Sequence, residues 1–95
     1  MFERQDKNNK ALVSVTIEKV LLDMGKPVYD KVIEKLHKDY HCYLPDCYEY
    51  PEYLSKVLKE LFGDASKTIV ESITKDLAKF DTNKPISRFL EVISQ

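Results

Sequence analysis

Large apolar side chains recur at steps of three and four residues in five separate segments of this 95-residue chain. This spacing places them on one face of an α-helix, whose period is 3.6 residues, whereas a half-buried strand needs a period of two. The segments cover residues 11–24, 27–39, 51–62, 64–80 and 85–93. The sequence therefore predicts an all-α fold, a compact bundle of about five helices with short loops.

Glycine and proline fall where these helices should end and begin. Gly25 and Gly63 are the only glycines, and each follows an apolar stripe, where a glycine with positive φ can end a helix. Three prolines suit the first helical turn, in which a missing N–H has no partner to lose: Pro27, Pro51 and Pro85. Asp64 is a predicted N-cap of the fourth helix, and residues 81–83 break the period before the fifth.

The first segment leaves two alternatives open. Its β-branched residues also suit a strand over 11–17, but the helical stripe continues past them and favours the helix. Leu12, Val15 and Leu22 lie off that stripe, so this helix is either central in the bundle or covered by a second copy in a homodimer. We expect the central position, with a flexible N-terminal segment over 1–9 and a single helical domain over 10–95.

Charge and motifs narrow the function classes. Fifteen Lys and Arg balance sixteen Asp and Glu, with only two arginines, which argues against nucleic acid as a partner. Glycine-rich phosphate loops and hydrolase or metalloprotease motifs are absent, so we predict no enzyme and no cofactor. Neither a membrane-spanning apolar run nor a signal peptide is present, so we expect a cytoplasmic protein without a membrane partner.

The unusual part of the chain is residues 39–53, the tyrosine-rich segment. It holds five of the six tyrosines, both cysteines and four carboxylates, without a lysine or arginine. Tyrosine is enriched at interface centres, and carboxylates attract a basic protein partner. Our leading hypothesis is therefore a protein-interaction or regulatory module whose partner-binding residues are Tyr43, Tyr48, Glu49, Tyr50 and Glu52. Alternatively, these rings only cover the open end of the bundle.

The same region offers ligands for a metal. The alternative hypothesis is a metal- or small-ligand-binding domain whose metal ligands are His37, His41, Cys42 and Cys47. His37 and His41 are one helical turn apart, but the spacing of the cysteines is longer than the usual zinc knuckle. A redox thiol pair is a further alternative, although acidic neighbours would raise the thiol pKa. Each cysteine could equally be a small buried hydrophobe.

Turn and cap motifs suggest that the chain resembles a known group of proteins. They lie in residues 18–29 (EKVLLDMGKPVY), 47–54 (CYEYPEYL) and 61–65 (LFGDA). Over about residues 18–77 the chain resembles a group of small helical proteins from archaea, with a Leu-Gly turn, a Tyr-Pro-Glu helix start and a Leu-Phe-Gly turn. The resemblance implies a helical fold. That group has no assigned activity, and the Cys42/Cys47 pair is not part of the pattern that carries the resemblance, so no catalytic residue is carried over.

Overall fold

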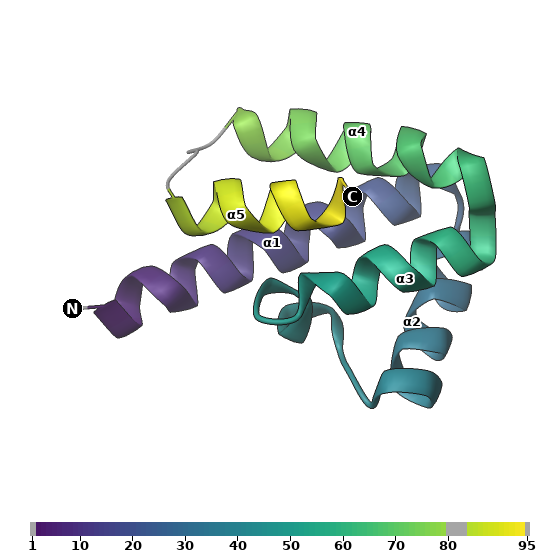
Figure 1. Ribbon diagram of the computed structural model, residues 1–95, viewed down its shortest axis with the longest axis horizontal. Helices are drawn as coiled ribbons and strands as arrows, with labels where there is room; N and C mark the ends of the chain where they lie inside the picture. The colour runs from purple at the N-terminus through teal and green to yellow at the C-terminus, as the bar shows by residue number, and fades with distance from the viewer. Residues whose placement is uncertain (1, 80–83, 95) are drawn as a thin grey trace.

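All regular structure in the described residues, 2–79 and 84–94, is helical in the computed structural model, and for residues 2–7 and 85 only the backbone is described. Five α-helices and two short 3₁₀ helices follow one another along the chain (Figure 1). They are α1 (Phe2–Met24), α2 (Lys26–Tyr40), η1 (Leu44–Tyr48), α3 (Pro51–Phe62), η2 (Gly63–Ala65), α4 (Ser66–Ala78) and α5 (Lys84–Ile93). This confirms the predicted all-α bundle.

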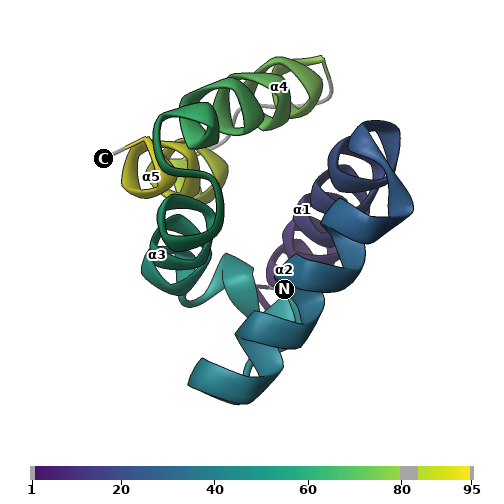
Figure 2. The same ribbon diagram turned by 90° about the vertical axis from the view of Figure 1, so that its right-hand side faces the viewer.

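The helices enclose one core. Helix α1 packs against α2, α4 and η1, while α3 packs against α2 and α5. Figure 2 shows α1 and α2 on one side and α3, α4 and α5 on the other. The bundle measures 36 × 26 × 23 Å. None of the described helices is long and apolar enough to cross a membrane.

Every predicted stripe contributes to this core. The following side chains are at most 4% exposed: Val13, Ile17, Val20, Leu21, Val32, Leu36, Leu54, Val57, Leu58, Ile69, Ile73, Leu77, Ile86, Phe89 and Ile93. Met24, at the end of the first stripe, is exposed, and further stripe residues are only partly buried, among them Val28, Ile33, Leu61, Phe62 and Leu90. Phe80 and the predicted break at 81–83 lie outside the described residues. The helical period therefore identified the buried faces correctly.

The helix boundaries follow the glycines, but not the predicted cap. Gly25 and Gly63 have φ angles of 126° and 56°, a region that side chains with a Cβ rarely adopt, so each ends its helix at little cost. Asp64 is not the N-cap of α4, because the chain first makes the 3₁₀ turn η2. Helix α4 starts at Ser66, without a side-chain cap hydrogen bond from the preceding Ala65.

The N-terminal segment differs from the prediction. Residues 2–9 continue α1 as helix, so the helix begins nine residues before the expected start at Ala11. Asn9 is only 5% exposed and its side chain is hydrogen-bonded to Tyr48. The polar sequence of residues 1–9 predicted a flexible end. The contact between Asn9 and Tyr48 instead helps to hold this part of α1 in place.

The predicted central position of α1 is also wrong for one of its faces. Val15 is 61% exposed and Leu22 is 43% exposed, while Leu12 packs against the core. Val15 and Leu22 are separated by two helical turns, so they share one outward face. A homodimer that covers this face stays a prediction.

Candidate interaction site

The site begins where α2 ends. His41 adopts the left-handed conformation (φ 51°), and the Cys42 N–H donates to the Leu36 carbonyl at 3.1 Å. The His41 N–H donates to the His37 carbonyl at 3.1 Å, which is the bond of an αL C-cap, and a glycine usually holds this left-handed position. The turn leaves the His41 side chain exposed and carries Cys42 into the core.

Asp46 organises the 3₁₀ turn that follows. Its side chain accepts a hydrogen bond from the Tyr43 N–H at 3.1 Å. Its carbonyl accepts from the Glu49 and Tyr50 N–H groups, both at 3.0 Å. These bonds satisfy the backbone of the turn and lead the chain into α3, whose first residue is Pro51. The connection between the predicted helices over 27–39 and 51–62 therefore contains a defined turn, η1.

Helix α1 holds this turn from outside. The Asn9 side-chain amide donates to the Tyr48 hydroxyl at 3.3 Å. The Lys10 ammonium lies 3.2 Å from a Glu49 carboxylate oxygen and 3.9 Å from an Asp46 carboxylate oxygen. Lys10 therefore offsets part of the negative charge that the sequence of the tyrosine-rich segment leaves unbalanced.

Three tyrosine rings form a ladder next to the turn. The rings of Tyr40 and Tyr53 stack with centroids 4.8 Å apart, and those of Tyr53 and Tyr50 stack at 5.4 Å. At one end of the ladder, the Tyr40 hydroxyl donates to Glu60 at 3.3 Å. At the other end, Tyr50 remains 46% exposed. Stacking fixes the orientation of the Tyr50 ring before any ligand arrives.

The carboxylates at the Tyr40 end of this ladder are already paired. The Lys35 ammonium lies 2.8 Å from Asp39 and 3.0 Å from Glu60. Hydrogen bonds to these two carboxylates raise the pKa of Lys35 above its ordinary value. This end therefore has little charge left to offer a ligand.

The Tyr50 end opens into a groove of about 640 Å³, which we call the charged groove. The end of η1 and the start of α3 line one side, and α5 lines the other. Its lining residues are Tyr48, Glu49, Tyr50, Pro51, Glu52, Lys84, Arg88, Phe89 and Val92. Carboxylates thus stand on the first side and cations on the second.

The charges of the groove are largely unpaired. Among the residues that the structure describes, neither Glu52 nor Lys84 nor Arg88 forms an ion pair within 4.0 Å. In the same part of the chain, Glu49 pairs with Lys10 alone. Exposed charges that lack a partner inside the protein keep their electrostatic attraction for a ligand.

Four of the five predicted partner-binding residues line this groove: Tyr48, Glu49, Tyr50 and Glu52. The fifth, Tyr43, is 59% exposed but lies outside the groove, with its ring tilted against that of His37 at 5.2 Å. Tyr48 is half-buried, so it supports the groove more than it projects into it.

The four predicted metal ligands are not brought together. Cys42 and Cys47 are buried, whereas His37 and His41 are exposed. Within residues 2–79 and 84–94, no three His, Cys, Asp or Glu side chains are grouped closely enough to hold a metal ion. The left-handed turn at His41 explains this, because it directs consecutive side chains in different directions.

The two thiols meet at one backbone carbonyl. Cys42 and Cys47 both donate to the Tyr43 carbonyl, at 3.4 and 3.8 Å, and neither forms a disulfide. Burial raises the pKa of both thiols. They are therefore protonated at neutral pH, a state that suits packing better than nucleophilic chemistry.

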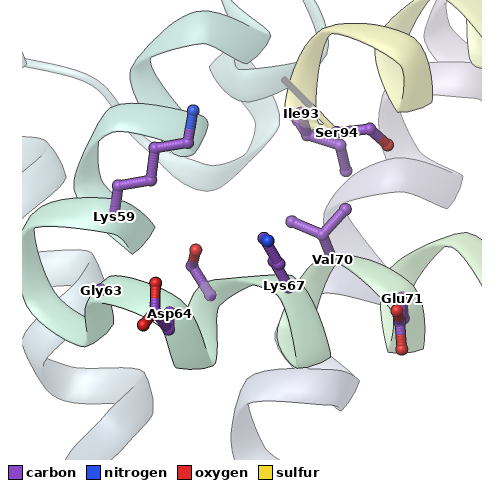
Figure 3. Close-up of a pocket in the computed structure, with 9 residues that line it drawn as sticks. Lys59, Gly63, Asp64, Lys67, Val70, Glu71, Ile93 and Ser94 are labelled. Atoms are coloured by element: carbon purple, nitrogen blue, oxygen red, sulfur yellow. The ribbon is translucent and has the colours of Figure 1, made fainter.

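A second hollow of about 600 Å³ lies where α3 ends and α4 begins, beside the end of α5 (Figure 3). Val70 and Ile93 form its apolar part. Charged side chains of both signs also line it: Lys59, Asp64, Lys67 and Glu71. None of the predicted partner-binding or metal-binding residues lines this hollow, and its charges do not separate into an acidic and a basic side.

Four polar or charged residues of the candidate interaction site were missed in the sequence: Asn9, Lys10, Lys84 and Arg88. Lys84 and Arg88 are one helical turn apart on a short helix, and this spacing signals a shared face. Nothing in the local pattern indicates that the face lies opposite residues 49–52.

Comparison with known proteins adds no relative: no family model, curated protein or solved structure matches this chain. The fold and the charged groove therefore carry the functional argument.

Proposed function

We propose that this protein is a non-enzymatic interaction module that binds a polypeptide segment of mixed charge in the charged groove. The observation that carries the proposal is the groove itself. It joins Tyr50 and Glu52 to two facing cations, and three of its charged side chains have no ion-pair partner among the described residues.

A polypeptide segment suits the groove better than a small anion or a metal. A small anion at Lys84 and Arg88 would also face the carboxylates of Glu49 and Glu52. A metal at those carboxylates would face the cations. A segment that presents a basic side chain to one side and an acidic side chain to the other satisfies both.

The aromatic surface supplies the contact area. Tyr50 and the partly buried Tyr48 have few rotatable bonds, so they lose little conformational entropy when a partner covers them. The Asn9 and Lys10 contacts hold the turn that carries these rings. A surface ordered in advance loses less free energy on binding than a flexible one.

Selection from a phage-displayed library of random heptapeptides tests this proposal. Peptides selected by the wild-type protein should bind at least tenfold more weakly to Tyr50→Ala and to Arg88→Ala. Tyr43→Ala is the matched control, because Tyr43 is an exposed tyrosine of the same segment outside the groove. If no peptide is selected, or if Tyr50→Ala and Arg88→Ala bind the selected peptides as well as Tyr43→Ala does, the proposal is wrong.

A further inference from the structure

The two ends of the tyrosine ladder differ in charge, and this difference points to the chemistry of the partner. At the Tyr40 end, Lys35 neutralises Asp39 and Glu60. At the Tyr50 end, an exposed ring lines the same groove as the carboxylate of Glu52, which has no ion-pair partner among the described residues. Within the described part of the chain, an exposed ring and a carboxylate without an ion-pair partner therefore occur together at the groove end of the ladder and not at the Tyr40 end.

We infer that the segment bound in the charged groove carries an arginine, whose guanidinium stacks on Tyr50 and pairs with Glu52. The inference rests on the proposed function and names the residue that the groove selects. A guanidinium is planar, so it can lie on an aromatic face while its N–H groups point outward to a carboxylate. One face of the Tyr50 ring is covered by Tyr53, and the exposed remainder of the ring receives the guanidinium.

Arginine fits this place better than lysine. The lysine ammonium is a compact, strongly hydrated charge without a flat surface, so it cannot combine stacking with a two-pronged hydrogen bond to Glu52. An aromatic side chain could stack on Tyr50 but would leave the Glu52 carboxylate without a partner. The combination of ring and carboxylate is therefore specific for a guanidinium.

The opposite side of the groove selects a second feature. Lys84 and Arg88 lie one helical turn apart on α5, and neither has an ion-pair partner among the described residues. An acidic side chain on the same segment, next to the arginine in space, can pair with both. The partner is therefore a segment in which an arginine and an aspartate or glutamate are presented together.

Peptides from the heptapeptide selection test the inference through substitutions in the peptide. Lysine in place of the peptide arginine keeps the positive charge but removes the planar guanidinium. Citrulline keeps a planar group of the same shape but removes the charge. We expect each change to raise the Kd at least tenfold in fluorescence anisotropy. In the protein, Glu52→Gln should weaken the arginine peptide tenfold and leave the citrulline peptide unchanged, whereas the control Glu71→Gln should affect neither.

The outcomes separate this inference from the proposed function. If selected peptides lose affinity for Tyr50→Ala and Arg88→Ala but contain no enriched arginine, or if lysine replaces arginine without loss, the groove binds peptides and the arginine inference is wrong. If Glu52→Gln weakens the arginine and citrulline peptides equally, the ion pair is refuted. If no selected peptide depends on the groove, the proposed function itself fails.

Discussion

The hydrogen bond between Asn9 and Tyr48 gives the sharpest test of how α1 holds the interaction site. The two residues are 39 positions apart in the chain, and the amide donates to the hydroxyl at 3.3 Å in a partly buried place. A protein hydrogen bond contributes about 0.5–1.5 kcal/mol net, and this one is longer than the most frequent distance. We therefore expect a coupling free energy of about 0.5–1 kcal/mol.

A single substitution would not reveal this coupling. Asn9→Ala removes the hydrogen bond, but alanine is a better helix former than asparagine by up to about 0.7 kcal/mol, so the two effects partly cancel. A double-mutant cycle with Tyr48→Phe removes the helix propensity from the comparison, because Asn9→Ala contributes it in both backgrounds.

Urea unfolding of the four proteins measures the cycle. For a small domain, the free energy of unfolding falls by about 1 kcal/mol for each 1 M of urea. The expected coupling therefore appears as a deviation from additivity of about 0.5–1 M in the urea midpoints of the four proteins. The matched control is the cycle of Asn9→Ala with Tyr43→Phe, because the Tyr43 ring packs on His37, and it should show additive free energies. A coupling below about 0.3 kcal/mol in the Tyr48 cycle would refute the idea that this bond joins α1 to the turn.

Three further predictions concern the fold. Leu58→Ala should lower the free energy of unfolding by about 2–5 kcal/mol in urea, because Leu58 is completely buried, whereas the exposed Val15→Ala should change it by less than about 0.5 kcal/mol. His41→Gly should raise it by about 0.5–1 kcal/mol, because glycine adopts the left-handed conformation without strain; an unchanged or lower stability would contradict this. Burial raises the pKa of the Cys47 thiol above the ordinary value of 9.0, so the folded chain keeps a proton that the unfolded chain loses. Stability should therefore fall as the pH rises above about 9, and Cys47→Ala should make that fall shallower in urea titrations at pH 8 to 10; equal slopes would contradict it.

The sequence predicted those parts of the fold that depend on local pattern. The stripe that contains Leu54, Val57 and Leu58 is buried because every third or fourth residue lies on one face of a helix. Gly25 and Gly63 end their helices because the chain adopts positive φ there. Both inferences need only a few neighbouring residues, so they can be made without knowledge of the tertiary structure.

The parts that failed depend on contacts between distant residues. Residues 2–9 have no apolar stripe, yet they form the first part of α1. The last of them, Asn9, is hydrogen-bonded to Tyr48, which is distant in the sequence. Val15 has the same apolar character as the buried Val13, and only the position of the neighbouring helices leaves it exposed. Local sequence cannot show which side of α1 the other helices occupy.

The interaction site lies between these two cases. The composition of residues 39–53 singled out Tyr50 and Glu52 as candidate contact residues, and both line the groove, but the cations opposite them come from α5, more than thirty positions later in the chain. The predicted acidic surface therefore became a groove with charges of both signs. The proposed partner changes accordingly, from a basic protein to a segment with an arginine and an acidic residue.

The two explanations for the tyrosine-rich segment, structural cover and the proposed contact surface, concern different residues within it. Leu44 and Cys47 are at most 6% exposed and close the core beneath the turn, while Tyr50 and Glu52 face outward. The buried residues fix the turn, and the turn fixes the direction of the exposed ones. A substitution such as Cys47→Ala should therefore disturb the groove although Cys47 does not line it, because the core packing of η1 determines where the Tyr50 ring lies.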